Sequence, residues 1–145
     1  MEVKTTKRTV EIEENRYISV DGKVFYSEME CAIHEESLVF DKAKKRLDML
    51  EIKNLRNEFP LPFGRKGYYY KWYKIYSAKD IEDIDIVHNG SLRDSWSHIF
   101  DGGVSPKIVC VEYGGSHYPN DTRMYTFDLV KEYMVEFLDK VYKSM

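Results

Sequence analysis

Cysteine is scarce in this sequence, which has only Cys31 and Cys110 among its 145 residues. So few cysteines exclude a disulfide-rich scaffold and favour a reducing compartment. The first residues lack the apolar run of a signal peptide, and no window is long and apolar enough to span a bilayer. We therefore expect a cytoplasmic protein with no membrane partner.

An excess of charge of one sign is also missing. The chain has 22 Lys and Arg against 25 Asp and Glu, for a formal net charge of −3. Binding of duplex nucleic acid usually leaves a basic footprint, so we expect no such partner. Apolar residues make up 43% of the chain, and internal repeats and low-complexity tracts are absent. These features predict a single domain over residues 1–145.

The sequence also lacks common catalytic motifs, because no G-x-S-x-G, H-E-x-x-H or P-loop pattern occurs. Cys31 and His34 form a C-x-x-H pair on an expected helix, but a zinc site needs about two more ligands. The other three histidines show no paired spacing. We predict no catalytic residue, no metal and no cofactor, and hence a protein that is not an enzyme. A Cys-His pair assembled from distant positions stays open.

What the chain does contain begins with short β-prone segments. The dipeptide Asp21-Gly22 predicts a hairpin, because the turn that it favours needs positive φ. Ser27 and Glu30 have the spacing of a capping box, which predicts the start of a helix. The expected strands cover residues 2–14, 17–20 and 23–26.

A long helix is expected next, because neither Gly nor Pro occurs from Glu28 to about Asn57. Its apolar residues follow 3-4 spacing. A helix of this length would reach roughly 40 Å and overhang a domain of this size. We therefore predict that the chain is a homo-oligomer; the alternative is a helix bent or broken near Asp48. The stripe comprises Met29, Ile33, Phe40, Ala43, Leu47 and Leu50.

The second half of the chain alternates strands with short helices. The pattern predicts an α+β fold: one antiparallel sheet with an N-terminal hairpin, one long helix and a C-terminal amphipathic helix. Residues 114–121 are expected to form a loop. The expected elements are a strand at 68–76, helices at 78–88 and 92–100, a strand at 107–113 and a helix at 126–142.

The strand YYYKWYKIY has aromatic side chains on both of its faces. Tyr68, Tyr70 and Trp72 share one face, because alternate residues of a strand do. The basic, glycine-flanked loop before them contains Arg65 and Lys66, which suit a phosphate. Together they predict a nucleotide site, with rings for the base and cations for the phosphates. The alternative is that the rings are buried, and the sequence leaves open which face is covered.

Two further arginines are weaker candidates for binding phosphate. Arg93 lies in the expected helical segment 92–100, and Arg123 lies in the polar stretch 116–123, which also contains Asn120 and Asp121. Functional groups often lie on such loops. The alternative is a solvated connection.

Two segments of the sequence resemble parts of known proteins. Residues 17–38, with D-G-K followed by F-x-S-x-x-E-C-x-x-H-E, and residues 72–81, W-Y-K-I-Y-S-A-K-D-I, resemble small accessory proteins encoded by bacteriophages. The resemblance implies a phage origin and, for location, the cytoplasm of a bacterial host. Several such proteins block bacterial immunity by binding, and those that counter Thoeris-type defence sequester a cyclic ADP-ribose-like nucleotide as small oligomers.

We therefore expect a counter-defence binding protein that sequesters a small signalling nucleotide, cyclic ADP-ribose-like or a cyclic oligonucleotide, without catalysis. One alternative is an anti-CRISPR-like inhibitor of a host defence nuclease or complex. It would act through the acidic segment 80–85, which includes Asp80, Asp83 and Asp85. A further alternative is an enzyme that cleaves the signal.

Overall fold

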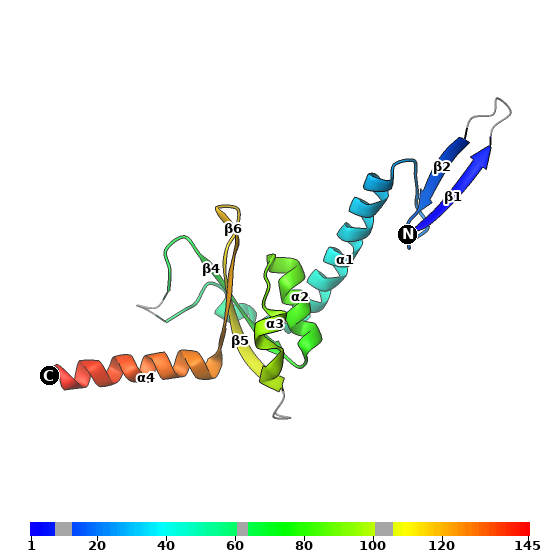
Figure 1. Cartoon of the computed structure of the whole chain (residues 1–145). Helices are drawn as coiled ribbons and strands as arrows, with labels where there is room; N and C mark the ends of the chain where they lie inside the picture. The colour runs from blue at the N-terminus through cyan, green and yellow to red at the C-terminus, as the bar shows by residue number, and fades with distance from the viewer. Residues whose placement is uncertain (8–12, 61–63, 101–105) are drawn as a thin grey trace. The chain divides into compact units, whose positions relative to one another are not determined.

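The computed structural model describes residues 1–7, 13–60, 64–100 and 106–145 (Figure 1). The chain divides into two compact units, Met1–Lys42 and Ala43–Met145. The boundary falls within the long helix α1 (Glu28–Leu50). The α+β class is confirmed, and a single domain over 1–145 stays a prediction.

The first unit contains a three-stranded antiparallel sheet with the order β1-β2-β3. The predicted Asp21-Gly22 turn is confirmed between its last two strands. Gly22 has a φ of +87°, and its N–H donates to the carbonyl oxygen of Ser19 at 2.9 Å. Residues 8–12 of the first expected strand lie outside the described residues. The strands are β1 (Glu2–Lys7), β2 (Glu13–Ile18) and β3 (Val24–Phe25).

Helix α1 begins where the capping signal predicts. Ser27 precedes its first residue, and the Ser27 hydroxyl accepts a hydrogen bond from the Glu30 N–H at 3.3 Å. The side chain of His34 lies on the following turn and contacts Asp21 in the hairpin, with Nε2 2.9 Å from Oδ2. The local cap therefore fixes the helix start, and a hairpin contact orients its first turns.

The end of α1 corrects the sequence prediction, because the helix stops at Leu50 and not near Asn57. The chain beyond it bonds to strand β4 (Tyr69–Ile75). The Ile52 N–H donates to the Trp72 carbonyl at 2.8 Å, and the Asn57 N–H donates to the Tyr70 carbonyl at 2.7 Å. Pairing with a strand edge thus competes with helix propensity and ends the helix.

The second unit contains a separate antiparallel sheet with the order β4-β5-β6 (Figure 1). The described strands therefore form two sheets, whereas the sequence pattern predicted one. The central strand β5 (Lys107–Gly114) pairs with β4 on one side and with β6 on the other. Its apolar sequence is consistent with this position.

Strand β6 (Tyr118–Thr126) is a second correction, because most of it was expected to be loop. Its Pro119, Asn120 and Asp121 have low β propensity. β6 lies at the edge of the sheet, where a proline without an N–H is tolerated. Pairing with β5 therefore overrides local propensity.

Apolar residues are buried on both faces of this sheet, which answers the question left open by the aromatic strand. Tyr73 and Ile75 lie in one cluster with Leu47 of α1 and with Ile81 and Ile84 of α2 (Ala78–His88). On the opposite face, Tyr70, Trp72, Cys110 and Val130 form a second cluster. The aromatic residues of β4 thus serve two cores. The short helices α3 (Arg93–Trp96) and η2 (Ser97–Phe100) contribute Trp96, Ile99 and Phe100 to the first cluster.

The C-terminal helix α4 (Phe127–Lys143) follows β6 directly. The Thr126 hydroxyl accepts a hydrogen bond from the Leu129 N–H at 3.2 Å, which confirms the amphipathic helix and its start. Val130 is its buried residue. Among the helices of the described residues, none has the length and apolar character needed to cross a bilayer.

We predict that Gly114→Ala destabilises the fold by about 1 to 3 kcal/mol, the usual cost of overpacking. A Cβ at this position would lie 2.2 Å from Cβ of Tyr118 and 2.8 Å from its carbonyl oxygen, so the β5-β6 connection must shift. The measurement is urea unfolding. Gly64→Ala is the control, because its nearest atom would be at an ordinary 3.6 Å. Equal stability of the two variants would contradict the prediction.

Candidate functional site

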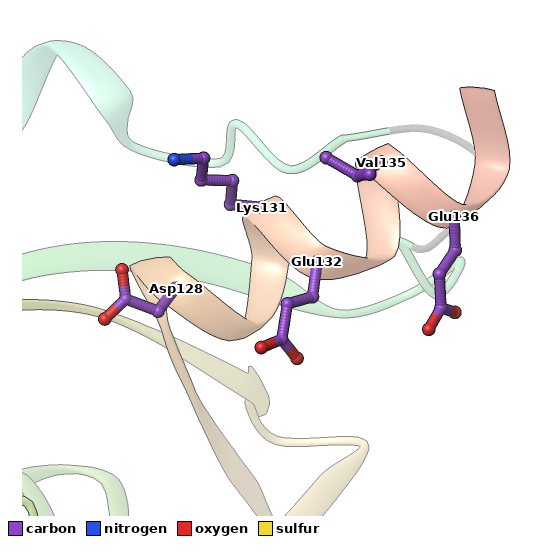
Figure 2. A pocket seen from close by; sticks show the side chains of 5 residues that line it. All are labelled: Asp128, Lys131, Glu132, Val135 and Glu136. Atoms are coloured by element: carbon purple, nitrogen blue, oxygen red, sulfur yellow. The ribbon is translucent and has the colours of Figure 1, made fainter. Parts of the chain in front are cut away.

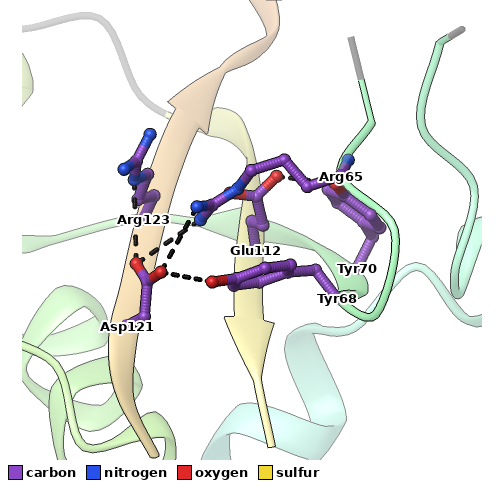
Figure 3. A network of polar contacts seen from close by, with 6 residues as sticks. All are labelled: Arg65, Tyr68, Tyr70, Glu112, Asp121 and Arg123. Atoms are coloured by element: carbon purple, nitrogen blue, oxygen red, sulfur yellow. Dashed lines mark hydrogen bonds and ion pairs between the residues drawn. The ribbon is translucent and has the colours of Figure 1, made fainter. Parts of the chain in front are cut away.

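A polar row crosses the sheet of the second unit. The strand register places Tyr70 of β4 opposite Glu112 of β5, and Glu112 opposite Arg123 of β6. Directly paired residues point to the same side of a sheet, so the three side chains form one row. Arg65, in the loop before β4, and Asp121 of β6 contact this row (Figure 3).

Glu112 is the buried charge of the cluster, with 0% of its surface exposed. Its carboxylate accepts a hydrogen bond from Arg65 Nε at 2.7 Å and one from the Tyr70 hydroxyl at 2.6 Å. The Tyr70 oxygen in turn accepts the Arg65 backbone N–H at 2.6 Å. These bonds fix the backbone of the basic loop at Arg65 and hold the Arg65 guanidinium in one orientation.

Asp121 is the second carboxylate, and three donors converge on it (Figure 3). Arg65 Nη1 lies 3.3 Å from Oδ2, and the Tyr68 hydroxyl donates to the same oxygen at 2.5 Å. Arg123 Nε lies 3.7 Å from Oδ1. Unlike Glu112, Asp121 is partly exposed. The arrangement places two arginines and one tyrosine hydroxyl around a single carboxylate of the protein itself.

The pKa shifts follow this geometry. The hydrogen bond from Tyr68 and the contacts with Arg65 hold the pKa of Asp121 below its ordinary value. Burial lowers the pKa of Arg65, but its bonds to Glu112 and Asp121 outweigh this effect and the pKa is raised. Burial, followed by the bond to Glu112, raises the pKa of Tyr70. The arginine therefore stays charged and both tyrosines stay protonated as donors, since bonding to Asp121 also raises the pKa of Tyr68.

An aromatic pair lies beside this cluster. The rings of Tyr68 and Tyr118 are nearly parallel, 7° apart, with centroids separated by 5.2 Å. Arg65 Cζ lies 3.7 Å from the centroid of the Tyr68 ring, within the range of a cation–π contact. Tyr118 is exposed, so one ring of the pair faces solvent.

The structure brings together only part of the predicted site. Arg65, Tyr68 and Arg123 surround Asp121, but Tyr70 and Trp72 are only 5% and 7% exposed. Tyr70 stacks on Phe59 with centroids 4.6 Å apart, and Trp72 Nε1 donates to the Glu58 carbonyl at 2.7 Å. Both rings are almost fully covered in this structure, so for them a stacking role has no structural support.

Two other predicted residues lie outside this cluster. Lys66 is exposed next to Arg65. Arg93 forms an ion pair with Glu82 of α2, its Nη1 3.4 Å from Oε2. Their assignment to a phosphate stays a prediction.

Sequence reasoning missed Glu112 and Tyr118. Glu112 is the only acidic residue in the apolar segment KIVCVEY, and a charge in a central strand requires a partner. The sequence therefore contained a signal for Glu112. Tyr118 had none, because its role depends on the unexpected strand β6.

The C-x-x-H pair does not form part of a metal site here. Cys31 is buried and burial raises the pKa of its thiol, whereas His34 contacts Asp21. Across the described ranges, three or more side chains of His, Cys, Asp or Glu do not gather in a way that would hold a metal ion.

The acidic segment of α2 is bonded within the protein. Asp83 is buried and binds Arg46 through two hydrogen bonds of 2.8 and 2.9 Å. Asp85 accepts the N–H groups of Leu92 and Arg93, and Asp80 caps the start of α2. Inhibition of a nuclease through these acids stays a prediction. In this structure each of the three acids bonds to groups of the protein itself.

No protein-family description, curated protein or solved structure matches this chain. A proposal about function therefore rests on the geometry and chemistry of this cluster.

A second polar pair lies in the opposite core. The Tyr73 hydroxyl and His88 Nε2 are 2.9 Å apart, and the His88 ring lies 4.5 Å from that of Tyr113. Burial, with a smaller contribution from Lys71, lowers the pKa of His88 to about 4. This histidine is a neutral core residue near pH 7.

We predict that Arg65→Met lowers the free energy of unfolding by about 3 kcal/mol or more, because it leaves the Glu112 charge buried without its cation. Arg123→Gln, an exposed change in the same cluster, should alter stability by less than about 0.5 kcal/mol. Glu112→Gln should restore part of the loss in the Arg65→Met background, as coupled partners do. Urea unfolding measures all three. Equal stability of Arg65→Met and Arg123→Gln would contradict the assignment.

We also predict that stability falls as the pH is lowered from 7.5 to 5.5. The folded pKa of His88 is about 4 and its ordinary value is 6.5, so the unfolded chain binds the proton first. The contribution is complete above pH 6.5 and declines below it, by about 1.3 kcal/mol over this interval. His88→Gln should remove the dependence, and His117→Gln, an exposed control, should retain it. An unchanged slope in His88→Gln would show that another group titrates.

Proposed function

We propose that this chain is a non-catalytic binding protein that sequesters a small phosphate-containing ligand, in the first instance a signalling nucleotide. The observation that carries the proposal is the convergence of Arg65, Arg123 and the Tyr68 hydroxyl on one partly exposed carboxylate. Arginine forks and tyrosine hydroxyls are the donors that phosphate oxygens require. The bacteriophage counter-defence setting is supported by the sequence resemblance alone.

In this proposal a phosphate takes the place of the Asp121 carboxylate. Asp121 is the exposed acid of the cluster, so its side chain can turn into water, whereas Glu112 stays buried and keeps Arg65 oriented. A phosphate carries more charge than a carboxylate and accepts more hydrogen bonds. The ligand therefore replaces an internal contact with a stronger one of the same kind.

The base of the nucleotide would lie on the Tyr118 side of the cluster. The Tyr68–Tyr118 pair presents an exposed ring directly beside the anion position. Stacking of a base on such a ring contributes about 1 to 3 kcal/mol and does not depend on the base. The stacking residues of the site thus become Tyr68 and Tyr118, in place of Tyr70 and Trp72.

The test is a thermal-shift and calorimetric screen with cyclic ADP-ribose, cyclic dinucleotides and linear ADP-ribose, followed by recovery of the ligand from denatured protein. A ligand that binds the native state raises the melting temperature. Intact ligand is expected. Recovery of a cleaved product would make the protein an enzyme, and no shift with any compound would contradict the proposal.

Three variants locate the site. Arg123→Gln should weaken binding about tenfold, because one charge-assisted contact is lost. Asp121→Asn should strengthen it, because the competing charge is removed. Arg93→Gln is the matched control, since Arg93 and Arg123 are 58% and 57% exposed and each pairs with one carboxylate. If the Arg123 and Arg93 variants bind the ligand with equal affinity, the ligand does not bind at this cluster.

A further inference from the structure

Next to its buried residue Val130, α4 has an exposed apolar face. Phe127, Met134, Leu138 and Val141 are exposed, and a lysine, Lys131, occupies the remaining position of their 3-4 spacing. We call these five residues the α4 seam. The carboxylates of Asp128, Glu132 and Glu136 project from one side of the helix and Lys131 from the other (Figure 2).

The spacing of the α4 seam is that of a two-helix contact. Apolar residues at alternating steps of three and four form the interface of paired helices, and a single Lys within it specifies register and oligomer state. A basic face suited to anionic lipid is not present, because α4 carries four acids and three lysines. The chemistry therefore favours another helix over a membrane surface.

We propose that the α4 seam pairs with the α4 seam of a second copy of this chain, in antiparallel orientation. A two-fold axis near residue 136 would place Met134 of one copy beside Leu138 of the other. Lys131 would then lie near Asp139 of the other copy. Parallel pairing would instead place the two copies of Lys131 side by side. The proposal is independent of the ligand site.

A groove beside the start of α4 supports the antiparallel choice. It has a volume of about 490 Å³ and a mostly apolar lining, and it adjoins the seam at Phe127 and Met134. In antiparallel pairing the last residues of the second copy reach this end of the seam. Its Tyr142 and Met145 are highly exposed apolar residues that would enter the groove. The remaining lining is Leu55, Glu58, Phe59, Pro60, Trp72, Ile108 and Val130.

The available area is adequate for a dimer. The exposed apolar side chains of the seam, with Val135, Tyr142 and Met145, would bury on the order of 600 Å² per copy, and the groove adds to this. A standard interface buries about 800 Å² per partner. The contact is thus of the size found in stable, modest-affinity dimers.

The test is sedimentation equilibrium of the full chain at micromolar concentration, where the mass of two chains is expected. Leu138→Glu should weaken the dimer by on the order of 100-fold, because two carboxylates would be buried without partners. Val141→Glu is a second variant of the same kind. Lys140→Glu, on the polar side of α4, is the control and should stay dimeric. Circular dichroism confirms that each variant is folded.

Orientation is tested by cysteine cross-linking. In antiparallel pairing, Lys131→Cys of one copy meets Val141→Cys of another, so a disulfide should form when the two variants are mixed and not in either alone. Cross-linking of each variant with itself would establish a parallel pair and overturn the proposal. A monomeric wild type, a dimer unaffected by Leu138→Glu, or a monomer that binds lipid vesicles through α4 would also overturn it.

Discussion

The buried carboxylate of Glu112 is the constraint on which the second unit depends. A charge at the centre of a sheet is tolerated only with a cation and hydrogen bonds around it. Arg65 and Tyr70 provide them, and their bonds determine where the basic loop lies and how it enters β4. The same arginine reaches Asp121 of the edge strand. One buried charge thus connects all three strands of this sheet with the loop before it.

The apolar cores complement this polar link. Because β5 is buried on both faces, its neighbour β4 needs bulky side chains on both sides, and alternating aromatic residues provide them. Tyr73 and Trp72, adjacent in sequence, belong to different cores for this reason. A segment that looks like a ligand platform is therefore mainly structural. In the proposed function, the residue of this segment that takes part in binding is Tyr68, which immediately precedes β4.

The sequence was informative where structure is local. The Asp21-Gly22 turn and the cap at Ser27 were predictable, because each depends on conformational preferences within four residues. The end of α1 and the strand that contains Asp121 were not, because both depend on pairing with distant segments. The site was predictable in part: Arg65 was identified as a basic group, but its partner Glu112 lies 47 positions away, and only the register of β4 and β5 joins them.

In the proposed function, the balance of charge in the cluster determines what kind of ligand can bind there. Arg65 and Arg123 carry two positive charges, and Glu112 and Asp121 carry two negative ones, so the cluster is neutral without a ligand. A neutral site does not attract anions from a distance, as an open basic pocket does. A ligand must instead outcompete Asp121 at short range, through more than one charged oxygen and a ring that stacks on Tyr118. In the proposed function a nucleotide is favoured over a simple anion, because its base adds stacking on Tyr118 to the contacts that its phosphate makes with the arginines.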